Sequence, residues 1–224
     1  PMNVAMEVVA QLKESGMVRR GWLGVAIQEV DKELAESFGL EVAAGALVSQ
    51  VVAQGPAASA GVRNGDIITE FNGKPVTLSS DLPHLVGRVR PGSKAKIRVI
   101  RYGKAKTLTV KIGVLPSEGN IMASMRSNTS SSALNRLGIE VGSLSSAQEK
   151  QWDTDGVIVK QVRQGAGANA GLVNGDVITM INGAMIRDMG DFDGVVSKLK
   201  AGSAVPMRIV RRGAPMFIPL RVIK

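Results

Sequence analysis

The chain has 224 residues, a formal net charge of +9 and no cysteine. The absence of cysteine excludes disulfides and thiolate metal sites, and no apolar run approaches the roughly 20 residues that a transmembrane helix needs. Apolar residues make up 44% of the chain and aromatic residues only 3%, so we expect a core built mainly from aliphatic side chains.

The pattern of apolar and turn-forming residues predicts short strands with a few short helices. Residues 1–20 form an amphipathic pattern that ends in a helix stop at Gly16. The elements that follow are a strand after Gly24, a helical turn at 34–38, a strand at 46–51, a short helix at 56–61, a strand pair joined at Asn72-Gly73, a helix at 79–89 capped by Ser79 or Ser80, and two closing strands around Tyr102-Gly103. Such an order fits a small, partly open β-barrel capped by helices.

The same elements recur in a second copy. The segment GVRNGDIITEFNG, from Gly61 to Gly73, returns as GLVNGDVITMING, from Gly171 to Gly183, with eight of thirteen positions identical at an offset of 110 residues. A repeat of this length is a duplicated domain rather than a solenoid unit, whose period is about 20–50 residues. Residues 116–133 are rich in Ser and Asn without periodicity, which is typical of a linker.

Basic residues cluster in both closing hairpins. Lys94, Lys96 and Arg98 alternate with apolar residues, so they are expected to line the solvated face of a strand. An acidic protein or a membrane surface is the lesser alternative for this charge. No aromatic residues are interleaved to stack bases, and nucleic acid is therefore not expected as a partner.

Catalytic residues are not recognisable in this sequence. A Ser-His-Asp triad needs a histidine, and the only one is His84, which falls on the predicted helix at 79–89 as a surface or groove-edge residue. No histidine pair is available for a metal, and no cofactor is expected. Asp66 and Asp176 occupy matching Asn-Gly-Asp sequences, where an aspartate is expected to stabilise a turn.

A binding site is better supported. Each copy opens its first strand with a leucine and a glycine, at Leu23-Gly24-Val25 and at Leu137-Gly138-Ile139. A glycine bend lets backbone N–H groups converge on an anion, and an extended peptide can add to the free edge of the strand that follows. A tight turn without a ligand explains the pattern about as well. Arg19 and Arg20 lie just before the first of these glycine bends in the sequence, and Arg136 lies just before the second. Their positive charges are expected to help attract an anionic ligand.

The helix after the Asn-Gly hairpin is expected to form the opposite wall. Its apolar positions are Leu82, Leu85, Val86 and Val89 in the first copy, and Phe192, Val195, Val196 and Leu199 in the second. Most of these side chains must belong to the core, and the spacing alone does not separate core residues from ligand contacts.

The order of these motifs closely resembles PDZ domains of the bacterial HtrA type, and the run GPAASAGVRNGDII is the most specific part of the resemblance. The resemblance implies two circularly permuted PDZ units in tandem, at residues 21–115 and 134–224, joined by the linker at 116–133. Residues 1–20 would then be the last helix of a preceding protease domain. Two units in series suggest the DegP, DegQ and MucD-like branch of periplasmic serine proteases, with the protease domain and its catalytic residues absent from this chain.

The resemblance also implies a function and a location. The first unit would capture apolar C-termini of unfolded proteins and present them to the protease domain, which it would also regulate, in the periplasm. Carried over by motif, the carboxylate loop is Trp22, Leu23, Gly24 and Val25, aided by Arg20, and the groove helix contributes Leu82, Leu85, Val86 and Val89. The equivalent positions in the second unit are Arg136, Leu137, Gly138, Ile139, Phe192 and Val196.

The second unit departs from this pattern, which leaves an alternative function open. Arg136 stands where the first unit has Trp22, and three prolines (Pro206, Pro215 and Pro219) are expected to interrupt the closing hairpin. The alternative is an oligomer-assembly module, the second unit especially, that contacts neighbouring protomers rather than substrate.

Overall fold

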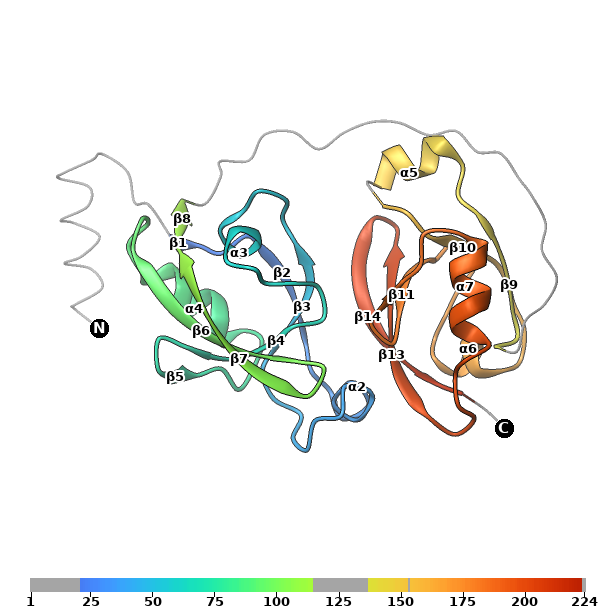
Figure 1. Ribbon diagram of the computed structural model, residues 1–224, viewed down its shortest axis with the longest axis horizontal. Coiled ribbons are helices and arrows are strands. Elements are labelled where there is room, and N and C mark those ends of the chain that lie inside the picture. Colours follow the sequence, from blue (N-terminus) through green and yellow to red (C-terminus); the bar gives the residue numbers. More distant parts are fainter. Residues whose placement is uncertain (1–20, 115–136, 153, 223–224) are drawn as a thin grey trace. The chain divides into compact units, whose positions relative to one another are not determined.

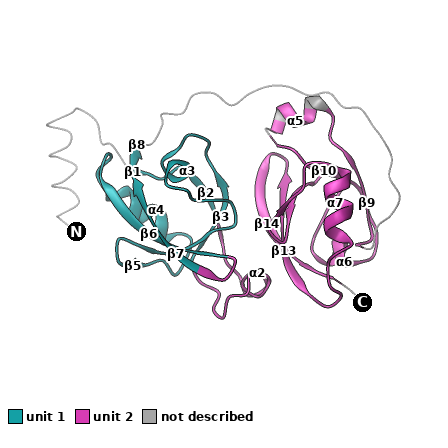
Figure 2. Ribbon diagram, in the orientation of Figure 1, with its two compact units in different colours: residues 1–27, 45–101, 105–119 teal, residues 28–44, 102–104, 120–224 magenta. Residues whose placement is uncertain are grey.

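The computed structural model describes residues 21–114, 137–152 and 154–222. The predicted helix at 1–20, which includes Arg19 and Arg20, the whole predicted linker at 116–133, and Arg136 lie outside the described residues. Contacts divide the chain into two compact units: unit 1 comprises residues 1–27, 45–101 and 105–119, and unit 2 comprises residues 28–44, 102–104 and 120–224 (Figure 2). Each unit has its own sheet and its own apolar core.

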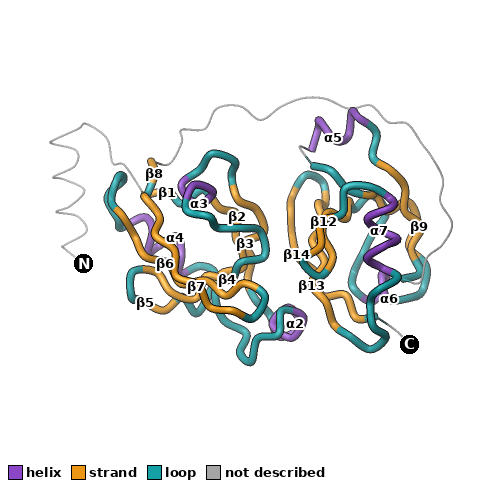
Figure 3. Tube along the Cα trace, viewed as in Figure 1, coloured by secondary structure: helices purple, strands orange, loops and turns teal. Residues whose placement is uncertain are grey.

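Strands dominate the first half of the chain, and its helices are short (Figure 3). Its six-stranded sheet has the order β2-β3-β4-β6-β7, with β5 paired to β4, and β1 pairs with β8 in a separate two-stranded ribbon. The elements are β1 (Gly21–Trp22), β2 (Val25–Glu29), α2 (Lys32–Ser37), β3 (Ala46–Val51), α3 (Pro56–Ser59), β4 (Ile67–Phe71), β5 (Lys74–Pro75), α4 (Asp81–Gly87), β6 (Lys94–Arg101), β7 (Lys104–Lys111) and β8 (Gly113–Val114).

The second half repeats this arrangement in a sheet ordered β14-β13-β11-β10-β9, with β12 paired to β11 (Figure 1). Its elements are β9 (Ile139–Ser143), α5 (Ser146–Trp152), β10 (Val157–Val162), α6 (Ala166–Asn169), β11 (Val177–Ile181), β12 (Ala184–Met185), α7 (Met189–Val196), β13 (Ala204–Arg211) and β14 (Ala214–Arg221). Neither six-stranded sheet closes on itself. The predicted fold class, mainly β with short helices and partly open, is therefore confirmed. Among the described residues, no helix has the length and apolarity to cross a membrane.

The cores are aliphatic, as the composition predicts. The unit 1 core gathers the inward side chains of β3, β4, β6 and β7 with Leu82 and Val86 of α4. The unit 2 core does the same with Phe192 and Val196 of α7. In β6, Ala95, Ile97 and Val99 are buried while Lys94, Lys96 and Arg98 are exposed, so the alternation read from the sequence correctly separates the two faces of this strand.

The prolines of the second closing hairpin do not interrupt it, and that expectation is wrong. Strands β13 and β14 pair without a break over eight residues, with Pro206 opposite Pro219. A residue in an antiparallel ladder points its N–H and C=O to the same neighbouring strand. The Pro206 carbonyl accepts a hydrogen bond from the N–H of Asn182 (2.8 Å), the residue after β11. The position of the missing Pro206 N–H therefore faces away from β14. Pro215 and Pro219 lie on β14, an end strand of the sheet, where a missing donor costs little.

A buried ion pair joins distant segments in unit 1. Asp66, whose side chain is 1% exposed, lies before β4 and receives two hydrogen bonds from Arg101 at the end of β6, at 2.6 and 2.7 Å. The same guanidinium donates to the Gly61 carbonyl (2.8 Å), and the second Asp66 oxygen also accepts from Arg63 N (2.9 Å). Asp66 thus stabilises its turn, as the sequence predicts, and also anchors β6 beside α3.

Unit 2 contains the same arrangement. Arg211 donates to both oxygens of Asp176, at 2.8 and 2.7 Å, and to the Gly171 carbonyl at 2.7 Å. Asp176 in turn accepts from Val173 N (3.0 Å). The duplication has therefore kept an interaction that spans 35 residues in each copy.

Replacing Asp66 by alanine should destabilise unit 1 by about 3–5 kcal/mol, because it leaves the Arg101 charge without its partner in a largely buried site. Of the two tryptophans, Trp22 belongs to unit 1, so its fluorescence in a Trp152→Phe background follows urea unfolding of that unit. Lys74→Ala, at an exposed side chain of unit 1, is the control and should change stability by less than about 0.5 kcal/mol. Equal effects of the two substitutions would contradict a structural role for the ion pair.

Candidate functional site

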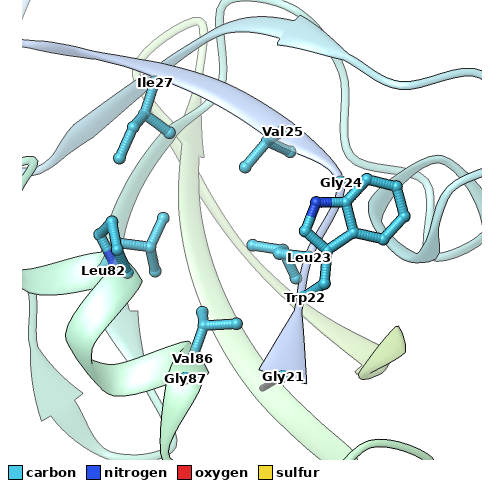
Figure 4. Close-up of a pocket in the computed structure, with 10 residues that line it drawn as sticks. Gly21, Trp22, Leu23, Gly24, Val25, Ile27, Leu82, Val86 and Gly87 are labelled. Atoms are coloured by element: carbon cyan, nitrogen blue, oxygen red, sulfur yellow. The ribbon is translucent and has the colours of Figure 1, made fainter. Parts of the chain in front are cut away.

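The candidate site is a groove of about 280 Å³ in unit 1, between the segment from β1 to β2 and the helix α4. Its lining is mostly apolar and consists of Gly21, Trp22, Leu23, Gly24, Val25, Ile27, Leu82, Pro83, Val86 and Gly87. Figure 4 shows the side chains of Val25 and Ile27 on one side of the hollow and those of Leu82 and Val86 on the other. Strand β2 is an end strand of its sheet, so this wall of the groove is a sheet edge.

The backbone bends sharply at the mouth of the groove. Gly24 has φ of +76°, a conformation that costs an L-residue with a side chain on the order of 1–2 kcal/mol. A Cβ atom at this position would also lie 3.2 Å from Pro56 Cδ and 3.3 Å from the Trp22 ring. Both backbone conformation and space therefore favour glycine.

The carbonyl groups of this bend have hydrogen-bond partners, whereas two of its N–H groups have none among the described residues. The Leu23 carbonyl accepts from Ala57 N and the Gly24 carbonyl from Val52 N, both at 2.9 Å. The N–H groups of Leu23 and Gly24 donate no hydrogen bond within the described part of the chain, although both residues are buried. Buried N–H groups nearly always have a partner. The bend therefore offers two adjacent donors to an acceptor that enters the groove.

The opposite wall depends on the start of α4. Ser80 occupies the predicted capping position, but its side chain makes no capping hydrogen bond. The Asp81 carboxylate instead accepts from Leu78 N (2.9 Å) and Thr77 N (3.0 Å), which fixes the loop that enters the helix. From this start, Leu82 and Val86 lie one turn apart and are buried at the floor of the groove.

The structure brings together six of the residues predicted for unit 1, namely Trp22, Leu23, Gly24, Val25, Leu82 and Val86. Leu85 and Val89 are not among the lining residues; they are half-buried and pack against the unit 1 core. Exposed His84 is not part of the lining. Leu85 and Val89 were assigned to the groove from helical spacing and the family resemblance, and neither separates core residues from lining residues.

Four lining residues were missed. Ile27 could have been found, since it follows Val25 by two positions and so points to the same side of β2. Gly21 carries no such signal: a Cβ there would collide with the carbonyl oxygens of Val86 and Val89, a contact that only the packed structure reveals. Pro83 and Gly87 each follow a predicted apolar position on α4.

In unit 2, the equivalent residues come together in the apolar core. Leu137, Ile139 and Phe192 are each 0% exposed, and Val196 is 4% exposed. All four belong to one core cluster. Gly138 keeps the left-handed bend, with φ of +72°. In the part of the chain that the structure describes, no cluster of acidic and histidine side chains could hold a metal ion.

A family profile described as PDZ domain matches residues 21–112 and 135–219. The chain therefore belongs to the PDZ-domain family and carries two copies, as the sequence predicts. The groove between the end strand β2 and the helix α4 therefore lies in a PDZ domain.

The relatives are HtrA-type proteases. The chain is 47% identical over 223 residues to a protein named "Probable periplasmic serine endoprotease DegP-like" from Pseudomonas savastanoi pv. phaseolicola (strain 1448A / Race 6), covering 99% of this chain and 47% of that protein. It is 48% identical over 224 residues to a protein of the same name from Ectopseudomonas mendocina (strain ymp), with coverage of 99% and 47%. The predicted resemblance to the HtrA family is thus confirmed, and the chain spans about half the length of these relatives.

Among solved structures, "HtrA-type protease AlgW with decapeptide" is 39% identical, with a TM-score of 0.47, and the match covers 53% of this chain and 36% of that chain.

The carboxylate that orders the start of α4 should titrate at low pH. Hydrogen bonds from Leu78 N, and then from Thr77 N, lower the pKa of Asp81 from its ordinary value of 3.8. Because the folded pKa is the lower one, its stabilising effect is present above pH 3.8 and is lost as the pH falls through the folded pKa. An NMR titration of the Asp81 carboxyl should give a midpoint below 3.8, and a midpoint at or above this value would contradict the assigned hydrogen bonds.

The bend can be tested with a pair of glycine substitutions. Gly24→Ala and Gly61→Ala both place alanine at positive φ, +76° and +81°, but only Gly24 has neighbours close to the added Cβ. Both variants should lose about 1–2 kcal/mol of stability from the backbone conformation, and Gly24→Ala somewhat more. If Gly24→Ala were as stable as the parent by urea unfolding, the left-handed backbone conformation at Gly24 would be contradicted.

Proposed function

We propose that unit 1 binds the C-terminal end of an extended polypeptide by strand addition to β2. In this arrangement the terminal carboxylate accepts hydrogen bonds from the N–H groups of Leu23 and Gly24, and the preceding residues pair with the free edge of the strand. The observation that carries the proposal is that the N–H groups of two buried residues, Leu23 and Gly24, have no hydrogen-bond partner among the described residues and lie at the mouth of an apolar groove. Hydrogen bonds from N–H groups to a charged acceptor are the stronger kind.

The lining sets the chemistry of the ligand. Leu23, Val25, Leu82 and Val86 surround the space beyond the bend, so the terminal side chain should be apolar and aliphatic, because an unpaired polar group buried there would lose its hydrogen bonds to water. The ligand adds only one short strand and therefore buries little surface, so affinities in the micromolar range are expected.

The relatives extend this proposal to the biological context. They are named as periplasmic serine endoproteases, and exposed apolar C-termini are abundant on unfolded polypeptides. We therefore propose that the chain captures the apolar ends of unfolded or misfolded proteins in the periplasm and presents them to a serine protease domain that it also regulates. The assembly role predicted for the second unit stays a prediction.

A peptide that ends in valine with a free carboxylate should bind in the micromolar range, whereas the same peptide with an amidated terminus should bind at least about tenfold more weakly. Amidation removes the negative charge of the terminal carboxylate and replaces one of its two acceptor oxygens with an NH2 group. Trp22 lines the groove, so its fluorescence in the Trp152→Phe background reports both titrations. Equal affinities for the acid and the amide would exclude recognition of the terminal carboxylate.

A further inference from the structure

The duplication allows each groove position of unit 1 to be compared with its equivalent in unit 2, and several of these positions carry different side chains. Val25 and Ile27 of β2 correspond to Ile139 and Val141 of β9, and Leu82 of α4 corresponds to Phe192 of α7. The inward residues of β2 are half-buried in unit 1. Their equivalents on β9 are 0% and 1% exposed. The surface on which a ligand side chain would rest is therefore already covered in unit 2.

The helix accounts for this difference. In unit 2, α7 packs directly on β9, and Phe192 shares one core cluster with Ile139 and Val141. In unit 1, the principal contacts of α4 are with β1 and β4, and a groove remains between α4 and β2. A phenyl ring fills more space than an isobutyl group, and a close-packed core leaves little room beside it for a further side chain.

The backbone bend is not what differs. Gly138 has φ of +72°, close to the +76° of Gly24. The Leu137 carbonyl accepts from Gly167 N (2.8 Å) and the Gly138 carbonyl from Arg163 N (2.9 Å), which repeats the two hydrogen bonds of the first bend. Unit 2 thus keeps the geometry of the bend while the apolar space beside it is filled.

We infer that Phe192 is a built-in occupant of the unit 2 groove, so that this chain has one open peptide site and one that its own phenylalanine closes. The residue at the first buried position of the groove helix, Leu82 or Phe192, decides whether a unit accepts a ligand. This inference rests on the proposed peptide binding by unit 1, and it assigns to unit 2 a role other than capture of C-termini.

The test uses the full 224-residue chain, labelled with ¹⁵N, and the valine-terminated free-acid peptide. Saturating peptide should shift the amide resonances of Gly24 and Val25 and leave those of Gly138 and Ile139 in place. Shifts at Gly138 and Ile139 in the parent chain would overturn the inference. Absence of shifts at Gly24 and Val25 would instead overturn the proposed function, so the two failures are distinguishable.

Reciprocal variants test the role of the ring. Leu82→Phe should weaken peptide binding at Gly24 at least about tenfold, because it places the closing residue in the open unit. Phe192→Leu, and Phe192→Ala as a second variant, should make Gly138 and Ile139 respond to the peptide. Leu220→Ala is the matched control: it also shortens a buried side chain of the same core cluster, on β14 rather than on the groove helix, and should produce no such response.

The outcomes separate cleanly. If the Phe192 variants keep dispersed amide spectra and bind peptide only at Gly24, Phe192 does not close the groove. If Leu220→Ala opens unit 2 as well, general loosening of the core explains the gain, and the inference is wrong. Should both Phe192 variants fail to fold, unweakened binding by Leu82→Phe would still contradict it.

Discussion

The proposed site depends on one backbone bend. At Leu23 and Gly24 the carbonyl groups are hydrogen-bonded to α3 and to the residue after β3, while the N–H groups have no partner among the described residues. Gly24 adopts a left-handed backbone conformation, which is strained for any residue that has a Cβ atom, so the bend requires glycine. In the proposed binding mode, the apolar groove determines which side chain a ligand presents, and the two donors require that the ligand bring a terminal acceptor.

Much of the fold could be predicted because its signals are local or repeated. Asn72-Gly73 and Asn182-Gly183 both have positive φ, as two-residue hairpin turns require, and the alternation in β6 correctly assigns its faces. The ion pair of Asp66 and Arg101 was missed, because no local pattern joins residues 35 positions apart. Its recurrence as Asp176 and Arg211 is visible in the repeat, although only the structure shows that the charges meet.

The site was predictable to the extent that it follows the bend and one face of α4. Spacing could not separate Leu82 and Val86, which line the groove, from Leu85 and Val89, which pack against the same core without lining it. Nor could spacing address the inferred closure of the second groove, because whether Phe192 leaves room beside β9 is a question of volume rather than of pattern. If Phe192 closes that groove, two duplicated domains with the same bend differ in function through a single packed side chain.

The central claim concerns where the terminal carboxylate lies, and a crystal structure of the chain with a valine-terminated peptide tests it most directly. The account predicts carboxylate oxygens about 2.7–3.2 Å from the main-chain nitrogens of Leu23 and Gly24, with the peptide backbone paired to β2. A peptide that occupied the groove with its carboxylate in solvent, or that bound without pairing to β2, would contradict it.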